Sequence, residues 1–380
     1  LLATLRNVQR IVAISGAAVS SVSRSVQNIV SVFNIPMISP ASTAAVLSNK
    51  ALYPTFMRVV PPDTLHGSAT ASTIKSIGWR RIATIFHDDD YGISSSQSLV
   101  TKAVELGIEV SAQISFPFGT TDFVTVVDAI EKLSDTHVLF IACYTFEAVE
   151  LFRELIKRDL TTGRFVFFGS DWLVDEFFES DLDQDKLHGL LVLQYLLDSS
   201  PLMDAFTDEW ETLNSTEYLG AGDRTYSQFA PLSYDTVMTT AYALQAAIDD
   251  GVDVFDGQVL LPYMAQTTFI GLTGNISFDV NYDRISPLAI RNYKGGAALQ
   301  TVGQWDTASS SLVFTDSIIY PGNMTRPPHL PIVASPESDK LVIVFVTVGV
   351  AIIVMAAIML TTWPIFSAAL ARPWIWLSVR

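Results

Sequence analysis

Short, nearly continuous apolar runs alternate with stretches of helical periodicity over the first half of the chain. The apolar runs predict strands over Arg10–Gly16, Ile35–Ser39, Arg80–Asp88, Glu109–Phe116, His137–Tyr144, Arg164–Asp171 and Gly189–Leu196. The stretches between them predict helices over Ser21–Phe33, Ser94–Leu106, Asp122–Leu133 and Phe146–Arg158. This alternation indicates βαβ units in parallel sheets. Runs without polar alternation are typical of strands that helices cover on both faces.

The pattern changes in the second half. Helical spacing dominates from Pro201 to Gln266. Four short β-type segments punctuated by Gly, Asn and Asp follow, at Gly271–Asp279, Leu288–Tyr293, Leu299–Trp305 and Ser311–Phe314. This punctuation predicts antiparallel, peripheral strands, and a proline-rich segment after them is expected to be semi-extended. The whole pattern predicts an α/β protein with doubly wound parallel sheets.

A long uncharged segment near the C-terminus predicts a transmembrane helix. Residues 341–371 contain no Asp, Glu, Lys, Arg or His. The most apolar part, residues 341–363, would span about 34 Å as a helix, enough for a hydrocarbon layer of about 30 Å. A buried soluble helix is the alternative, but such helices usually keep a polar face. Arg372 and Arg380 follow the span, so we expect the large domain outside the cell and the C-terminus inside.

Composition excludes several classes of protein. The formal net charge of −16 argues against a nucleic-acid partner, which would need a basic face. Hydrophobic residues make up 49% of the chain, which excludes disorder. Three sequons, at Asn214, Asn275 and Asn323, predict glycosylation and agree with an extracellular domain.

No catalytic, metal-binding or cofactor-binding signature is present. The chain lacks GxSxG, Walker and GxGxxG motifs. Cys143 is the single cysteine and the five histidines are scattered, so we expect no metal and no cofactor. The consecutive acids Asp88–Asp90 do not follow the alternate spacing of a calcium loop, so a solvated loop is expected. Cys143 lies in an apolar run and is predicted to be an inert buried thiol.

Hydroxyl side chains follow two of the predicted parallel strands. Ser20 and Ser21 begin the helix after the first strand, and Ser42 and Thr43 lie at the equivalent place after the second. Ligands of open α/β sheets bind at this edge, where a helix N-terminus suits a carboxylate. A serine that simply caps its helix is the alternative explanation.

The residues that follow carry a specific resemblance. IPMISPASTAAVLSNKALYPTFMRVVPPDTLH (Ile35–His66) is similar to the lobe-1 signature of class C receptor ectodomains, the two-lobed Venus-flytrap relatives of periplasmic binding proteins. The similarity continues through GWRRIATIFHDDDYG, FFGSDW, APLSYD, FIGLTGNISFDVNYDR and VGQWD, and covers nearly all of residues 10–325. SSVS, YPTF, TLH and APLSYD most resemble metabotropic GABA receptors, and then metabotropic glutamate receptors.

The resemblance implies a domain organisation. Lobe 1 would comprise residues 1–61 and 198–266, and lobe 2 residues 62–197 and 267–320. A stalk (321–340), the transmembrane helix (341–363) and a short tail (364–380) would follow. The family normally has further residues before this lobe-1 signature, so the chain is expected to be truncated at its N-terminus.

The resemblance also implies a ligand site. Ser20 and Thr43 match hydroxyls that hold the ligand carboxylate, and His66 matches a histidine that supports that end. Asp63 matches a residue that meets the α-amino group. The matching lobe-2 contacts are Tyr91, Tyr144, Asp171 and Trp172.

Two positions depart from the family pattern. Ser233 stands where glutamate-type receptors have a basic residue for the distal carboxylate. Phe229 stands where GABA-type receptors have an acidic residue for the amine. The anchor for the far end of either ligand is therefore missing, and the sequence leaves the ligand unidentified.

We therefore expect the ligand-binding region of a cell-membrane receptor, not an enzyme. It would close on a small amino-acid-like carboxylate, work as a homo- or heterodimer and signal through a G protein. A single-pass receptor with a cyclase domain and a substrate-binding protein for amino-acid transport remain alternatives.

Overall fold

A computed structural model describes residues 11–170, 172–195, 200–218, 221–222, 229–296, 299–307 and 309–329. Most of the expected stalk, the expected transmembrane helix at 341–363 and the tail at 364–380 lie outside these ranges. Among the helices that are described, none combines the length and the apolar character needed to cross a bilayer.

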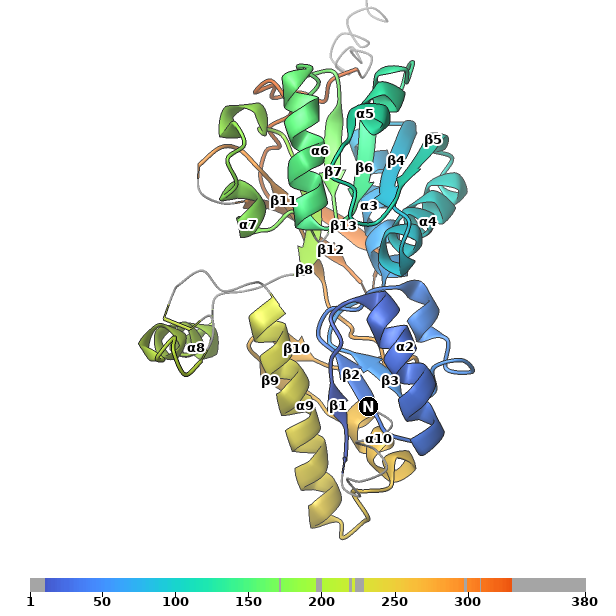
Figure 1. The fold of residues 1–380 in the computed structure, drawn as a ribbon, viewed down its shortest axis with the longest axis vertical. Coiled ribbons are helices and arrows are strands. Elements are labelled where there is room, and N and C mark those ends of the chain that lie inside the picture. Colours follow the sequence, from blue (N-terminus) through green and yellow to red (C-terminus); the bar gives the residue numbers. More distant parts are fainter. Residues whose placement is uncertain are drawn as a thin grey trace, which may run out of the picture. The chain divides into compact units, whose positions relative to one another are not determined.

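A small parallel sheet is formed near the start of the chain. It comprises β1 (Ile14–Ser15), β2 (Met37–Ser39) and β3 (Phe56–Arg58), in that order. The helices around it are α2 (Ser20–Val30), α9 (Phe229–Asp249) and α10 (Gly257–Gln266), as Figure 1 shows. Its apolar core contains Val30, Met37, Ala44, Leu47, Tyr53 and Phe56. The first predicted strand is thus confirmed only at its end, since β1 has two residues.

A larger mixed sheet holds eight strands. In order they are β13 (Ser311–Phe314), β12 (Gln300–Asp306), β11 (Leu288–Asn292), β8 (Leu191–Tyr195), β7 (Val166–Gly169), β6 (Val138–Ala142), β4 (Arg81–His87) and β5 (Glu109–Phe116). The strands from β5 to β8 pair in parallel. Every residue of β6, β7 and β8 is buried, as the uninterrupted apolar runs predicted.

Helices cover this sheet, as Figure 1 shows: α3 (Asp63–Ile77), α4 (Asp90–Glu105), α5 (Val124–Glu131), α6 (Thr145–Lys157) and α7 (Asp175–Phe178). The helices α3 and α4 pack directly on each other. A Cβ atom on Gly67 of α3 would lie 2.5 Å from the Ser98 carbonyl carbon of α4. Only glycine therefore permits this close approach. The remaining helices are α8 (Pro201–Thr212) and the 3-10 turns Ser31–Phe33, Ala45–Ser48 and Gln184–Lys186.

The late strands differ in part from expectation. They pair antiparallel, as predicted. However, the expectation that they are peripheral is wrong for β11, which lies between β8 and β12 with four of its five residues buried. The apolar run Leu288–Ile290 completes the main sheet, and the polar punctuation around it marks only the turns.

A separate hairpin, β9 (Phe269–Gly271) with β10 (Gly274–Ile276), is anchored on α9. The buried carboxylate of Asp235 accepts hydrogen bonds from the backbone N–H of Leu272 at 2.7 Å and of Thr273 at 2.9 Å. The hairpin falls in the residue range predicted for lobe 2, although α9 falls in the range predicted for lobe 1. Together the two sheets and their helices give a two-lobed α/β fold of the periplasmic-binding-protein type.

The strand β3 and the helix α3 were not foreseen. The strand ends in Arg58, whose side chain is fully buried. Its Nε lies 2.6 Å from Asp283 Oδ1, and its guanidinium also donates to the carbonyls of Ser42 and Ala44. An arginine inside an apolar segment argues against a buried strand, because arginine is rarely buried without a charged partner. The partner of Arg58 lies 225 residues away, so the local sequence does not reveal it.

Candidate ligand-binding pocket

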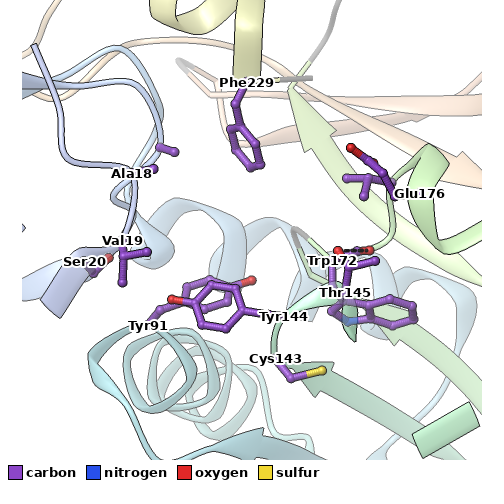
Figure 2. A pocket seen from close by; sticks show the side chains of 12 residues that line it. Ala18, Val19, Ser20, Tyr91, Cys143, Tyr144, Thr145, Trp172, Glu176 and Phe229 are labelled. Carbon is purple, nitrogen blue, oxygen red and sulfur yellow. Dashed lines mark hydrogen bonds between the residues drawn. The ribbon is translucent and has the colours of Figure 1, made fainter. Parts of the chain in front are cut away.

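A cavity of about 260 Å³, which we call the main pocket, lies at the edge where several parallel strands end. Loops and helix ends around the small sheet contribute Ala18, Val19, Ser20, Ala41 and Phe229. The large sheet contributes Tyr91, Cys143, Tyr144, Thr145, Trp172, Val174 and Glu176. Figure 2 shows the aromatic side chains of the two groups facing one space. A molecule in this cavity would contact both parts of the fold.

The N-terminus of α2 forms one wall of the pocket. Its N-cap residue is Val19, which has extended backbone angles and supplies no side-chain cap. The first N–H groups of a helix have no partner within the helix, and they carry a partial positive charge. Since Val19 and Ser20 both line the cavity, this end of α2 faces the place where a ligand would lie.

Ser20 does not cap its own helix. It is the first residue of α2, it is 2% exposed, and its Oγ accepts a hydrogen bond from the Ala44 N–H at 3.2 Å. The hydroxyl therefore ties the loop after β1 to the loop after β2, and its proton remains available to a ligand. Ser21 is turned about 100° further around the helix and does not line the pocket.

The loop after β2 supports this wall from behind. The Ser42 hydroxyl lies 2.8 Å from that of Ser23 and donates to the carbonyls of Ala17 and Ala18. Thr43 is buried, and its carbonyl accepts from the Asp63 N–H at 2.8 Å. Thr43 does not line the pocket, because the chain turns its side chain inward beside Asp63.

Two tyrosines form the facing wall. Tyr91 lies in the first turn of α4, and its hydroxyl donates to Ser170 Oγ at 2.8 Å. Tyr144 precedes α6, and its hydroxyl donates to Asp89 Oδ2 at 3.2 Å. The two rings lie 5.6 Å apart between centroids. Neither partner, Ser170 or Asp89, lines the pocket, so these hydrogen bonds hold the two tyrosines from residues outside its lining.

Trp172 belongs both to the core and to the pocket. Its indole N–H donates to the Ile141 carbonyl at 2.8 Å. Its ring lies 4.8 Å from Phe177 and 5.5 Å from Phe152 between centroids. Core packing therefore holds the ring rigidly while one part of it borders the cavity.

A buried histidine supports the tyrosines. His87 Nδ1 lies 2.7 Å from Glu147 Oε2, and its Nε2 lies 2.8 Å from Asp89 Oδ1. Burial alone lowers the pKa of His87, but the hydrogen bonds and charges of Asp89 and Glu147 outweigh burial and raise it to about 9. His87 is thus an imidazolium at neutral pH. It joins Asp89, which holds Tyr144, to Glu147, which accepts from the Tyr144 N–H.

Asp63 and His66 line a second, much smaller cavity. Its volume of about 10 Å³ has room for roughly one water molecule. Burial raises the pKa of Asp63 to about 6, against the opposing effects of the Ser94 and Thr43 hydroxyls and the Arg58 charge. Burial lowers the pKa of His66 to about 4. Tyr91 lines both cavities, so these two residues lie behind the main pocket.

The structure brings together four of the residues predicted from sequence: Ser20, Tyr91, Tyr144 and Trp172. It does not place Ser21, Thr43, Asp63 or His66 on the lining of the main pocket. Asp171 lies outside the described residues. Ser233 also lies away from the pocket, with an exposed side chain that donates to the Phe229 carbonyl.

Glu176 and Val174 were missed. Both follow Trp172 in the segment after β7, at the carboxyl edge of the sheet where ligands bind. Their position at this edge was the one signal in the sequence that could have identified them as lining residues. The expectation of a solvated loop at Asp88–Asp90 holds only for Asp88, which is exposed, since Asp89 and Asp90 are half-buried. Asp89 caps α4, Asp88 accepts from the Phe118 N–H, and Asp90 pairs with Arg24.

The structure also bears on the predictions made for Cys143, for metal binding and for the three sequons. Cys143 is buried, and burial raises the pKa of its thiol well above the ordinary value. Within the described ranges, no cluster of three or more His, Cys, Asp or Glu side chains could hold a metal ion. Asn214, Asn275 and Asn323 are exposed, and their glycosylation stays a prediction.

Comparison with known proteins agrees with the class of protein that the sequence predicts. The family model for the receptor family ligand binding region matches residues 1–296. Glutamate receptor 3.1 of Oryza sativa subsp. japonica is 24% identical over 83% of this chain and 37% of its own length. Metabotropic glutamate receptor-like protein E of Dictyostelium discoideum is 27% identical over 87% of the chain and 40% of its own length.

Gamma-aminobutyric acid type B receptor subunit 1 of Mus musculus is 24% identical over 77% of the chain and 33% of its own length. Relatives named for glutamate are therefore at least as similar as this one, and the predicted preference for GABA-type receptors is unsupported. The chain spans at most about two fifths of the length of these curated relatives.

Proposed function

The chain belongs to the family of receptor ligand binding regions, and from that premise we propose that its main pocket binds a small amino-acid-like molecule by the carboxylate. The family and its named relatives are ligand-binding domains and receptors, so the chain is a receptor domain and not an enzyme. The observation that carries the proposal is that one cavity is bordered by the α2 N-terminus and by the aromatic residues of the large sheet.

The chemistry of the two walls supports this assignment. A carboxylate beside Ser20 would accept hydrogen bonds from the hydroxyl and from the first N–H groups of α2, and the helix dipole would favour its negative charge. The rest of the molecule would lie against Tyr144 and Trp172. Both walls line the same cavity, so a bound molecule would contact both.

Binding at both walls provides a mechanism for signalling. We propose that the two lobes separate and approach, and that the ligand favours the closed arrangement. A ligand shifts such an equilibrium only through its higher affinity for one state. An affinity ratio of about 100 between closed and open forms corresponds to about 2.7 kcal/mol.

Several properties of the whole protein are part of the proposal. A receptor of this kind would sit in the cell membrane with the pocket outside, carry glycans at its exposed sequons and work as a dimer. Metabotropic receptors among the relatives favour coupling to a G protein over a cyclase domain or a transport system. Cross-linking of the full chain in membranes would test the dimer, and a purely monomeric product would contradict it.

The carboxylate site has a direct test with a matched control. In the full chain, Ser20→Asp places a negative charge inside the pocket wall, whereas Ser21→Asp places the same charge in the same helical turn outside it. We expect Ser20→Asp to weaken amino-acid binding at least about tenfold, or about 1.4 kcal/mol, and Ser21→Asp to leave it within about twofold. Calorimetry with glutamate, leucine, alanine and 4-aminobutyrate supplies the measurement. Equal affinities for the two variants would refute the site.

A further inference from the structure

Four aromatic rings dominate the lining of the main pocket: Tyr91, Tyr144, Trp172 and Phe229. Three of them have a polar atom that already bonds to a residue outside the lining. The hydroxyl of Tyr91 donates to Ser170, that of Tyr144 to Asp89, and the indole N–H of Trp172 to the Ile141 carbonyl. The fourth ring, Phe229, has no polar atom. The surface that these side chains offer to a ligand is therefore largely apolar.

Phe229 reaches the cavity from the opposite side to the other rings. It is the first residue of α9, and Figure 2 shows its ring pointing down from that helix toward Tyr144 and Trp172. A ligand held by its carboxylate at the α2 N-terminus would present its far end to the space between Phe229 and Trp172. Apolar groups gain about 25 cal/mol for each Å² buried in such surroundings.

The charged residues on and near the lining also favour a ligand with an apolar far end. Glu176 is the one Asp, Glu, Lys, Arg or His side chain among the described lining residues. Two described arginines close in sequence to the small parallel sheet already have acidic partners, since Arg24 pairs with Asp90 and the buried Arg58 pairs with Asp283. A second carboxylate on the ligand would therefore lose water without meeting a described cation, and it would meet the negative charge of Glu176.

Size limits the ligand further. The cavity volume of about 260 Å³ is below the range of about 300–1,000 Å³ typical of pockets for drug-sized ligands. A single amino acid is the class of molecule that fits both this size and the carboxylate site.

From these contacts we infer that the pocket selects a neutral amino acid with an apolar side chain, such as leucine or phenylalanine, over glutamate. The inference rests on the proposed function and adds the substrate class to it. Phe229 is the specificity-determining residue, because its ring contacts the side chain of the ligand. Glu176 acts against acidic ligands by like-charge repulsion.

The test measures the affinity of the full chain for leucine, phenylalanine, alanine, glutamate and 4-aminobutyrate by calorimetry. Leucine or phenylalanine should bind at least about tenfold more tightly than glutamate. Phe229→Ala should weaken leucine binding about tenfold and change alanine binding by less than about twofold. The matched control Phe33→Ala, which removes a half-exposed ring far from the lining, should change neither. Glu176→Gln should strengthen glutamate binding several-fold relative to its effect on leucine binding.

The outcomes separate the two proposals. Tighter binding of glutamate than of leucine and phenylalanine would overturn the substrate class and leave the proposed function standing. Unchanged leucine binding in Phe229→Ala would overturn the role of that ring. Failure of all five compounds to bind a folded wild-type chain, with folding checked by thermal unfolding, would overturn the proposed function and this inference together.

Discussion

The imidazole of His87 lies 4.7 Å, centroid to centroid, from the ring of Tyr144, a pocket residue. The two residues also share partners, since Asp89 and Glu147 each contact both of them. A buried positive charge thus lies directly behind the wall that would contact the ligand.

Stability should fall at alkaline pH because of this charge. The pKa of His87 is raised from an ordinary value of 6.5 to about 9, so its contribution is fully present below pH 6.5 and is lost as the pH rises through 9. We expect the melting temperature of the wild type to drop between pH 7 and 10 more than that of His87→Gln. Parallel pH profiles for the two proteins would contradict the assignment.

Asp63 should act in the opposite direction. Burial raises the pKa of this carboxyl from 3.8 to about 6, so the folded state binds the proton more tightly than the unfolded chain does. The contribution of Asp63 to stability is greatest below pH 3.8 and is lost as the pH rises to 6 and above. We expect Asp63→Asn to raise the melting temperature at pH 7.5 relative to wild type and to have less effect at pH 4.5. A lower melting temperature at pH 7.5 would show that the charge is stabilising.

The buried pair of Arg58 and Asp283 should be sensitive to loss of one partner. Arg58→Met leaves the Asp283 carboxylate buried without its cation, which typically costs about 3–5 kcal/mol. Arg81→Met breaks the exposed pair with Glu109 and should cost at most about 1 kcal/mol. Urea unfolding of both variants measures the difference. Similar free energies of unfolding for the two variants would refute the importance of burial.

The contact between α3 and α4 should not tolerate a side chain at Gly67. Gly67→Ala puts a methyl group 2.5 Å from backbone atoms of Ser98, which cannot move independently of α4. We expect a loss of about 1–3 kcal/mol from overpacking, visible in thermal unfolding. Ser76→Ala, at an exposed position of the same helix, serves as the control and should change stability little. A stabilised Gly67→Ala protein would mean that the helices separate at no cost.

Local signals explain which elements could be predicted. The strands β4, β6, β7 and β8 follow from apolar runs in the sequence, and the helices between them from their periodicity. The strand β5 lies at the edge of the sheet, and Phe116 is its one buried residue. The strand β3 was missed because Arg58 is buried only through Asp283, which lies far along the chain. The peripheral assignment of β11 failed because turn residues describe the ends of a strand and not its place in a sheet.

The candidate site, like the fold, could be predicted from the sequence only in part. Sequence alone determined an α/β protein with a hydroxyl at the start of α2 and aromatic residues after two parallel strands, because apolar periodicity and loop composition are local properties. Only the tertiary structure decided that Ser20 faces the pocket while Thr43 and Asp63 lie behind it, and that Phe229 and Glu176 complete the lining. The physical reason is that a pocket is a contact between segments distant in sequence, and which face each side chain shows is set by packing that no single segment encodes.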